Sequence, residues 1–178
     1  QQWWISGDFQ NINGQLLIGP YSDLRKQRYT FFDEPTYFSF RLYNLTLDDG
    51  KRWMQELGSK QIPIQWIIES KQYAQDGSQF AGLQNIFRDN PSVHIIGDDR
   101  LGVSYQHAKT FFTDTNFLIQ TANMTYSSFH NNRELFFLSA DTWVLSSLQN
   151  LFRNDWAWLS TNADALHPNL VVCPINCR

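Results

Sequence analysis

Two short hydrophobic runs, separated by a stretch with helical periodicity, constrain the fold of this chain most. Residues 37–43 form an alternating, aromatic-rich run that is typical of a buried strand. A helix is predicted over residues 48–59, with Thr46 and Asp48 as possible caps. Residues 62–68 form a second apolar run that predicts a strand. Pro63 does not exclude this strand, because a proline is tolerated near the beginning of a strand. Strand, helix and strand within about 32 residues predict a βαβ unit with a right-handed crossover.

The remainder of the chain predicts further strands and helices around this unit. Strands are expected over 15–18, 93–96, 106–113, 117–122 and 135–138, and helices over 22–32, 79–88 and 142–159. Apolar residues of two predicted helices are expected to face the core. They are Trp53, Met54 and Leu57 of the helix 48–59, and Trp143, Leu148, Leu151, Phe152 and Trp156 of the helix 142–159. The order of the elements predicts an α/β fold, a mixed β-sheet sandwiched between helices. We divide the chain into a polar lead-in, 1–36, and a single domain, 37–178.

Composition narrows the class of protein. The 178 residues are 42% hydrophobic and include 14 Phe, 7 Trp and 7 Tyr, enough aromatic area for a sizeable core. A net charge of −3 argues against a surface that coats nucleic acid, although a local basic cleft is compatible with it. No apolar run is long enough for a transmembrane helix. The sequence begins with Gln1 rather than Met, which suggests that a signal or anchor has been removed. Such a segment would agree with an extracytoplasmic or membrane-peripheral location.

The cysteines do not indicate a metal site. Cys173 and Cys177 are the only two in the chain, and no histidine lies beside them, so a zinc site is not expected. A disulfide that closes a small loop and a pair of free thiols both remain open.

The residues that can carry chemistry begin with His107 and Lys109. On the predicted strand 106–113 they are two positions apart, so both side chains are expected on one face of the sheet. An imidazole beside an ammonium forms a credible anion site, in which the cation holds a phosphate and the ring acts as nucleophile or proton carrier.

Later segments offer partners for this pair. The second strand can bring Asn123 and the Thr121 hydroxyl alongside as neutral donors, and Glu134 can accept the other ring N–H of His107. Each residue also has an ordinary explanation, because Asp114 suits a tight turn, Asn123 a strand end and Glu134 a solvated surface.

Read together, the residues form a recognisable series. His107-X-Lys109-X4-Asp114 is followed by Asn123, nine residues after the aspartate, and then by Asn132-Arg-Glu134 before a hydrophobic strand. The series resembles the signature of the phospholipase D superfamily, His-X-Lys-X4-Asp, Gly-Ser-X-Asn and Asn-X-Glu. One departure is Gln120-Thr121 in place of Gly-Ser: Thr121 keeps the hydroxyl, but Gln120 lacks the close backbone approach of glycine.

The resemblance implies a metal-independent phosphodiesterase without a cofactor that works through a phosphohistidine intermediate. It implies that His107 attacks phosphorus or protonates the leaving oxygen, and that Lys109 and Asn123 hold the non-bridging oxygens. Glu134 would orient His107, whereas Asp114 and Thr121 would have supporting roles.

One such motif supplies only half of a site, because the chemistry needs two histidines. His94, His130 and His167 have no lysine two residues on. A C2 homodimer that pairs two copies of His107 is expected, and a second half in a longer two-motif protein is the alternative. The expected substrate is a phospholipid, as for phospholipase D or cardiolipin-synthase-like enzymes. An endonuclease that cleaves DNA or RNA and a weakly active phosphate-binding module are the alternatives.

Overall fold

The computed structural model describes residues 13–18, 35–43, 45, 48–69, 93–97 and 107–162. Their secondary structure consists of β1 (Gly14–Ile18), β2 (Phe38–Leu42), α2 (Asp48–Ser59), β3 (Ile64–Ile68), β4 (Val93–Gly97), β5 (Thr110–Phe112), β6 (Phe117–Gln120), α5 (Tyr126–His130), β7 (Leu135–Ser139) and α6 (Thr142–Asn162). The helices expected over 22–32 and 79–88, together with His167, Cys173 and Cys177, lie outside the described residues.

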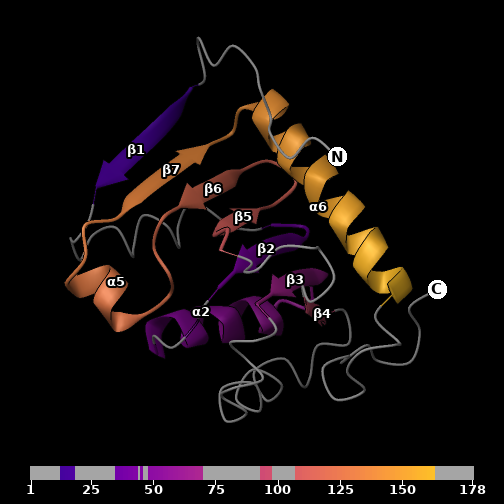
Figure 1. The fold of residues 1–178 in the computed structure, drawn as a ribbon, viewed down its shortest axis with the longest axis horizontal. Helices are drawn as coiled ribbons and strands as arrows, with labels where there is room; N and C mark the ends of the chain where they lie inside the picture. The colour runs from indigo at the N-terminus through magenta and orange to yellow at the C-terminus, as the bar shows by residue number, and fades with distance from the viewer. Residues whose placement is uncertain are drawn as a thin grey trace.

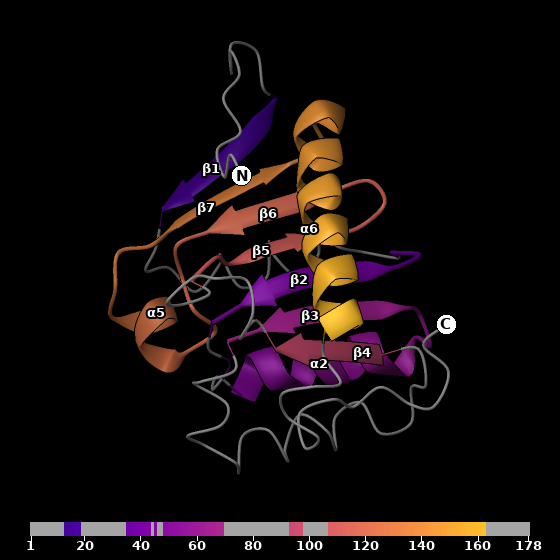
Figure 2. The ribbon, with the colours of Figure 1, turned by 45° about the vertical axis from the view of Figure 1, so that its right-hand side comes forward.

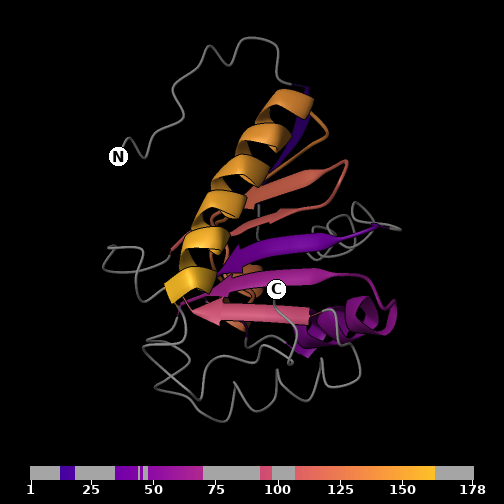
Figure 3. The same cartoon turned by 90° about the vertical axis from the view of Figure 1, so that its right-hand side faces the viewer.

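A single mixed sheet organises these elements. Its strand order is β1-β7-β6-β5-β2-β3-β4. Strands β2, β3 and β4 run parallel, and the pairs from β2 through β5, β6 and β7 to β1 are antiparallel. Helix α6 crosses one face of the sheet and α2 lies at the other (Figures 1, 2 and 3). The predicted α/β fold, a mixed sheet between helices, is therefore confirmed.

The predicted βαβ unit is present as β2, α2 and β3. Leu42 pairs with Ile68 at the end of the parallel ladder. Helix α2 buries Trp53, Met54 and Leu57 against the sheet, as their spacing predicts.

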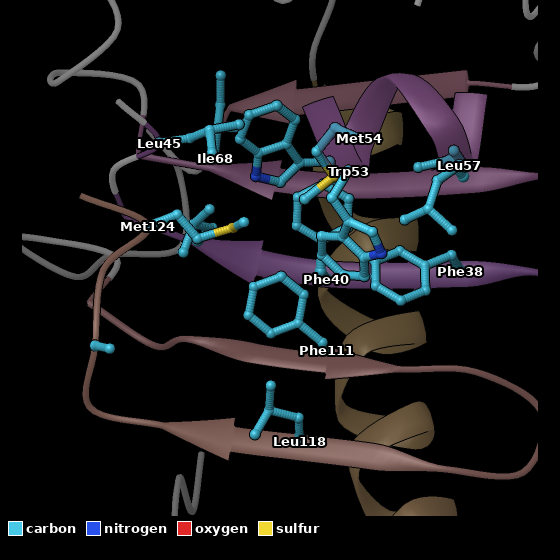
Figure 4. Packing of buried hydrophobic residues seen from close by; sticks show 14 of the residues in the cluster. Phe38, Phe40, Leu45, Trp53, Met54, Leu57, Ile68, Phe111, Leu118 and Met124 are labelled. Atoms are coloured by element: carbon cyan, nitrogen blue, oxygen red, sulfur yellow. The ribbon is translucent and has the colours of Figure 1, made fainter. Parts of the chain in front are cut away.

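Aromatic rings fill the interface between α2 and the sheet (Figure 4). Phe40 is stacked between Trp66 and Phe111, with centroid separations of 4.8 Å and 5.6 Å. All three side chains are fully buried. Because they come from β2, β3 and β5, they join the parallel and antiparallel parts of the sheet in one core.

A second apolar cluster lies under α6. The helix begins at an Asp141 cap, whose Oδ1 accepts from the backbone N–H groups of Trp143 and Val144, each at 3.0 Å. Its buried positions follow helical spacing and include Val144, Leu145, Phe152 and Leu159. Leu148 and Trp156 are partly buried against this cluster.

Two of the expected core residues of α6 are exposed instead. Trp143 is 49% exposed and Leu151 37%, so the prediction that they face the core is wrong. Val144 and Phe152 face the sheet. Trp143 and Leu151 each precede one of them by one residue, so their side chains are turned about 100° away from the sheet. Arg41 of β2 and Asp155 of α6 form an ion pair on the sheet side.

Three further differences concern short elements. Strand β5 begins at Thr110 rather than at 106, and helix α5 was not predicted. The signal for α5 was Thr125, whose Oγ1 accepts from Ser128 N at 3.3 Å as an N-cap. The strand expected over 15–18, which we assigned to the lead-in, forms the edge strand β1 and pairs with β7 of the same sheet.

Candidate functional site

One edge of the sheet gathers most of the candidate residues. The carboxyl ends of β2 and β3 lie there, beside the amino end of β5, the carboxyl end of β6 and the amino end of β7, as the parallel and antiparallel pairings require. Helix α5 lies at this edge (Figure 2). Residues that are far apart in the sequence therefore lie close together at this edge, as is usual for binding sites of α/β sheets.

His107 and Lys109 lie just before β5. The backbone N–H of Gln120 donates to the Lys109 carbonyl at 3.0 Å, so strand pairing extends to Lys109. His107 is exposed, whereas Lys109 is only 3% exposed and its Nζ donates to the His107 carbonyl at 2.7 Å. The two side chains are neighbours, but His107 lies outside the strand and faces solvent, which differs from the predicted pair on one strand face.

The aromatic ring of Tyr43, the residue after β2, contacts both groups. Its centroid lies 5.0 Å from that of the His107 ring in an edge-on arrangement, and the Lys109 Nζ lies 5.6 Å from the Tyr43 centroid. Burial lowers the pKa of Lys109 to about 8, against the opposing effect of Glu134. Burial and then the Lys109 charge lower the pKa of His107, while the Glu69 charge raises it. A lowered pKa favours the neutral imidazole, the form that can attack.

Glu134 is fixed by donors other than His107. Its Oε2 accepts from the Thr121 hydroxyl at 2.5 Å, and its Oε1 accepts from Asn132 Nδ2 at 3.2 Å. Thr121 Oγ1 in turn accepts from the Leu135 backbone N–H at 3.0 Å. The exposed Thr121 and the buried Glu134 therefore form a polar bridge between the ends of β6 and β7, and the charge of Glu134 acts on Lys109.

Two amide side chains at the edge have an oxygen without a hydrogen-bond donor. Gln120 is 5% exposed, and its Nε2 donates to the Ala122 carbonyl at 2.7 Å. Within the described part of the chain, Gln120 Oε1 and Asn123 Oδ1 are both buried without a partner. Buried acceptors of this kind are uncommon and are often satisfied by water or a ligand. Asn123 follows the carboxyl end of β6 and therefore lies at the same edge as Lys109.

Asp114 lies at the opposite edge of the sheet. It follows the carboxyl end of β5, about 16 Å along the chain from Lys109 at the usual strand rise. Its Oδ1 accepts from the Thr36 backbone N–H at 3.5 Å, and the Thr113 hydroxyl accepts from the Asn116 N–H at 3.1 Å in the turn that follows. In this structure Asp114 is a turn residue far from His107.

The other described histidines differ from His107. His94 is half-buried in β4. His130 is exposed at the end of α5 and stacks on Tyr126 at 4.2 Å. In the described ranges no three His, Cys, Asp or Glu side chains group closely enough to hold a metal ion. The helices found in these ranges include none with the length and apolar character needed to cross a bilayer.

Sequence reasoning missed Glu69 and Tyr43. Glu69 is 1% exposed and directly follows the buried strand β3. A carboxylate at the carboxyl end of an apolar parallel strand is a signal that could have identified it, because ligands bind outside those ends in open α/β sheets.

Comparisons with known proteins place this fold. No protein-family model matches the chain, and no curated protein matches it. Among solved structures, NucT from Helicobacter pylori is similar at a TM-score of 0.68 and 17% identity, over 83% of this chain and 97% of that one. Nuc from Salmonella typhimurium, a phospholipase D family member, is similar at 0.67 and 14%, over 82% and 95%. Phosphatidylserine synthase of Haemophilus influenzae Rd KW20 follows at 0.66 and 10%, over 84% and 40%. The described sheet and its helices therefore have the fold of the phospholipase D superfamily.

Proposed function

We propose that this chain is a metal-independent phosphodiesterase of the phospholipase D kind, with His107 as its nucleophile. The observation that carries the proposal is the position of His107, exposed at the sheet edge beside a buried lysine whose pKa is lowered to about 8. An accessible neutral imidazole can attack phosphorus, and the adjacent cation stabilises charge on the non-bridging oxygens. The superfamily fold supports the same activity.

In the proposed reaction a ring nitrogen of His107 forms a bond to phosphorus while the bond to the leaving oxygen breaks. Lys109 and Asn123 hold the non-bridging oxygens as charge increases on them. A second imidazole gives its proton to the leaving oxygen and then takes one from water or an alcohol, whose oxygen attacks phosphorus and releases His107. Water as acceptor gives hydrolysis, and an alcohol gives transfer.

The second imidazole is proposed to come from His107 of another copy in a C2 homodimer. The alternative is a second motif on a longer chain. The exposure of His107 at an edge of the sheet supports either arrangement, because a partner surface can approach it there.

A phospholipid is the substrate that we favour. Strand register places Leu16, Ile18 and Leu135 on the same side of the sheet as α6, where their side chains are 60%, 55% and 46% exposed. Trp143 and Trp158, 49% and 45% exposed, add apolar surface on α6 itself. Leu135 directly follows Glu134 in the chain, so these apolar side chains extend to the sheet edge that holds the candidate site, on the face that carries α6. Exposed apolar side chains near a phosphate site suit a lipid aggregate better than a nucleic acid.

A nucleic acid is the second candidate, because α5 offers a stacking surface at the same edge. Tyr126 is 62% exposed and stacks on the exposed His130, and bases can stack on such rings. The exposed Arg133 adds one positive charge nearby. A weakly active phosphate-binding module is the third candidate, since the buried Gln120 side chain stands where the superfamily pattern has glycine.

The deciding experiment measures turnover by the purified chain of two substrates: phosphatidylglycerol vesicles, and single-stranded DNA, each with EDTA present. The matched variant is His107→Ala, and Lys60→Met serves as a control because this lysine is exposed on the turn after α2. We expect lipid cleavage that persists in EDTA and is lost in His107→Ala. DNA cleavage alone would move the assignment to an endonuclease. If the chain turns over neither substrate but still binds inorganic phosphate, the weakly active phosphate-binding module is the function that remains.

A mixing experiment tests the shared site. If two copies of His107 complete one site, randomly paired equal amounts of wild type and His107→Ala give active wild-type dimers in about a quarter of the pairs. Activity per wild-type chain should then fall by half. Unchanged activity per wild-type chain would contradict the homodimer.

A further inference from the structure

Two carboxylates approach the His107–Lys109 pair from opposite sides of the sheet edge, and they are placed differently. Glu134 follows β6 and precedes β7, and both of its oxygens accept hydrogen bonds, from Thr121 and Asn132. Its charge acts on Lys109. Glu69 lies on the other side, after β3, and is the carboxylate whose charge acts on His107.

The strand order explains how Glu69 reaches His107. Leu42 pairs with Ile68 in the parallel ladder, so the next residues, Tyr43 and Glu69, are neighbours at the ends of β2 and β3. β5 lies on the other side of β2. Glu69 and His107 therefore flank Tyr43, with backbones about 10 Å apart at two strand spacings, a gap that two long side chains can close.

Tyr43 defines the space between them. Its ring contacts the His107 ring edge-on at 5.0 Å, which limits the rotamers of the imidazole. Glu69 is 1% exposed, so its charge is screened less by water than that of a surface carboxylate. The charges of Glu69 and Lys109 act on the His107 ring in opposite directions, since the carboxylate favours the protonated ring and the ammonium favours the neutral one.

From this arrangement we infer that Glu69 is a positioning residue for His107, orienting the ring and stabilising its protonated form, while Glu134 positions Lys109. The inference rests on the proposed function for its catalytic consequence, but not for its physical test. In the described residues, the groups that act on or contact the His107 ring are Glu69 after β3, Tyr43 after β2 and Lys109 in its own segment.

The test is a proton–carbon NMR titration of the histidine rings, with His107 assigned by its absence in His107→Ala. In Glu69→Gln the midpoint of His107 should move to lower pH, because the anion that favours the charged ring is gone. In the matched variant Glu134→Gln the His107 midpoint should stay in place. An unmoved midpoint in Glu69→Gln, or a larger shift in Glu134→Gln, would overturn the inference. If Glu69→Gln does not fold, Glu69→Asp retracts the carboxylate by one methylene, and it must lower the midpoint or the inference fails.

A kinetic readout separates positioning from bulk stability. In Glu69→Gln the acidic limb of kcat/KM should move to lower pH, and kcat should fall about 100-fold, as expected when a reacting group is misplaced, with KM little changed. Lost thermal stability together with an unmoved acidic limb would indicate a merely structural role and refute the inference. Failure of the proposed function is distinct, since it would appear as His107→Ala retaining full phosphodiester cleavage while the titration still shows the Glu69 effect.

Discussion

Replacing Lys109 by methionine should stabilise the fold while it removes activity. The pKa of Lys109 falls from 10.5 to about 8 in the folded chain. This lowering corresponds to at most about 3 kcal/mol against the charged form. Lys109 is 3% exposed but lies at the rim of the sheet, where less protein surrounds it than in the core, so solvent screening reduces this figure to about half. Loss of the bond from Nζ to the His107 carbonyl costs about 1 kcal/mol in return. The net gain at pH 7 should be roughly 0.5 kcal/mol.

The pH dependence distinguishes this explanation from better packing of methionine. A lysine with a lowered folded-state pKa destabilises the fold wherever it is charged in both states, which is below about pH 8. The penalty declines as the pH rises from about 8, where the folded group loses its proton, towards 10.5. Urea unfolding of wild type and Lys109→Met at pH 7, 8, 9 and 10 should therefore show a stability advantage that shrinks with pH, with Lys60→Met as the exposed control. A variant that is less stable than wild type at pH 7, or an advantage independent of pH, would refute the reasoning.

Three further predictions concern other parts of the structure. Asp155→Asn leaves the Arg41 guanidinium without its buried anion and should cost about 3 kcal/mol in urea unfolding, and a loss below about 1 kcal/mol would contradict a buried pair. Asp114→Ala should leave kcat/KM within about twofold of wild type, because this turn lies at the far edge of the sheet. A large loss of kcat in a folded Asp114→Ala chain would show that the far edge acts on the site. Since burial and Lys109 lower the pKa of His107, the acidic limb of kcat/KM should have its midpoint below pH 6.5, and a midpoint above that value would argue against His107 as the attacking group.

The strands could be predicted where hydrophobic pattern alone decides the structure. Phe38, Phe40 and Leu42 alternate with residues that meet the other face, and both faces of β2 are buried. Such runs are recognisable without tertiary information. In the structure Lys109 and Asn123 lie at one edge of the sheet, because both flank strands joined by a short turn.

What the sequence could not predict depends on contacts between distant segments. The edge position of β1 results from pairing with β7, and a polar-flanked run of four residues carries no sign of its partner. The partners of Glu134 were equally hidden, since a residue pattern does not say whether a carboxylate will meet a histidine or a threonine. Trp143 was assigned to the core because hydrophobicity alone does not fix which face of a long helix meets the sheet.

The junction between the parallel and antiparallel parts of the sheet has a kinetic consequence. Ser39 of β2 pairs with Phe112 of β5, a separation of 112 − 39 = 73 residues, and this pairing brings Tyr43 near His107. Closing so long a loop is slow compared with forming a helix or a hairpin. In refolding, helical ellipticity should therefore recover before catalytic turnover. The lag between the two signals would measure how long the antiparallel part of the sheet takes to pair with the parallel part.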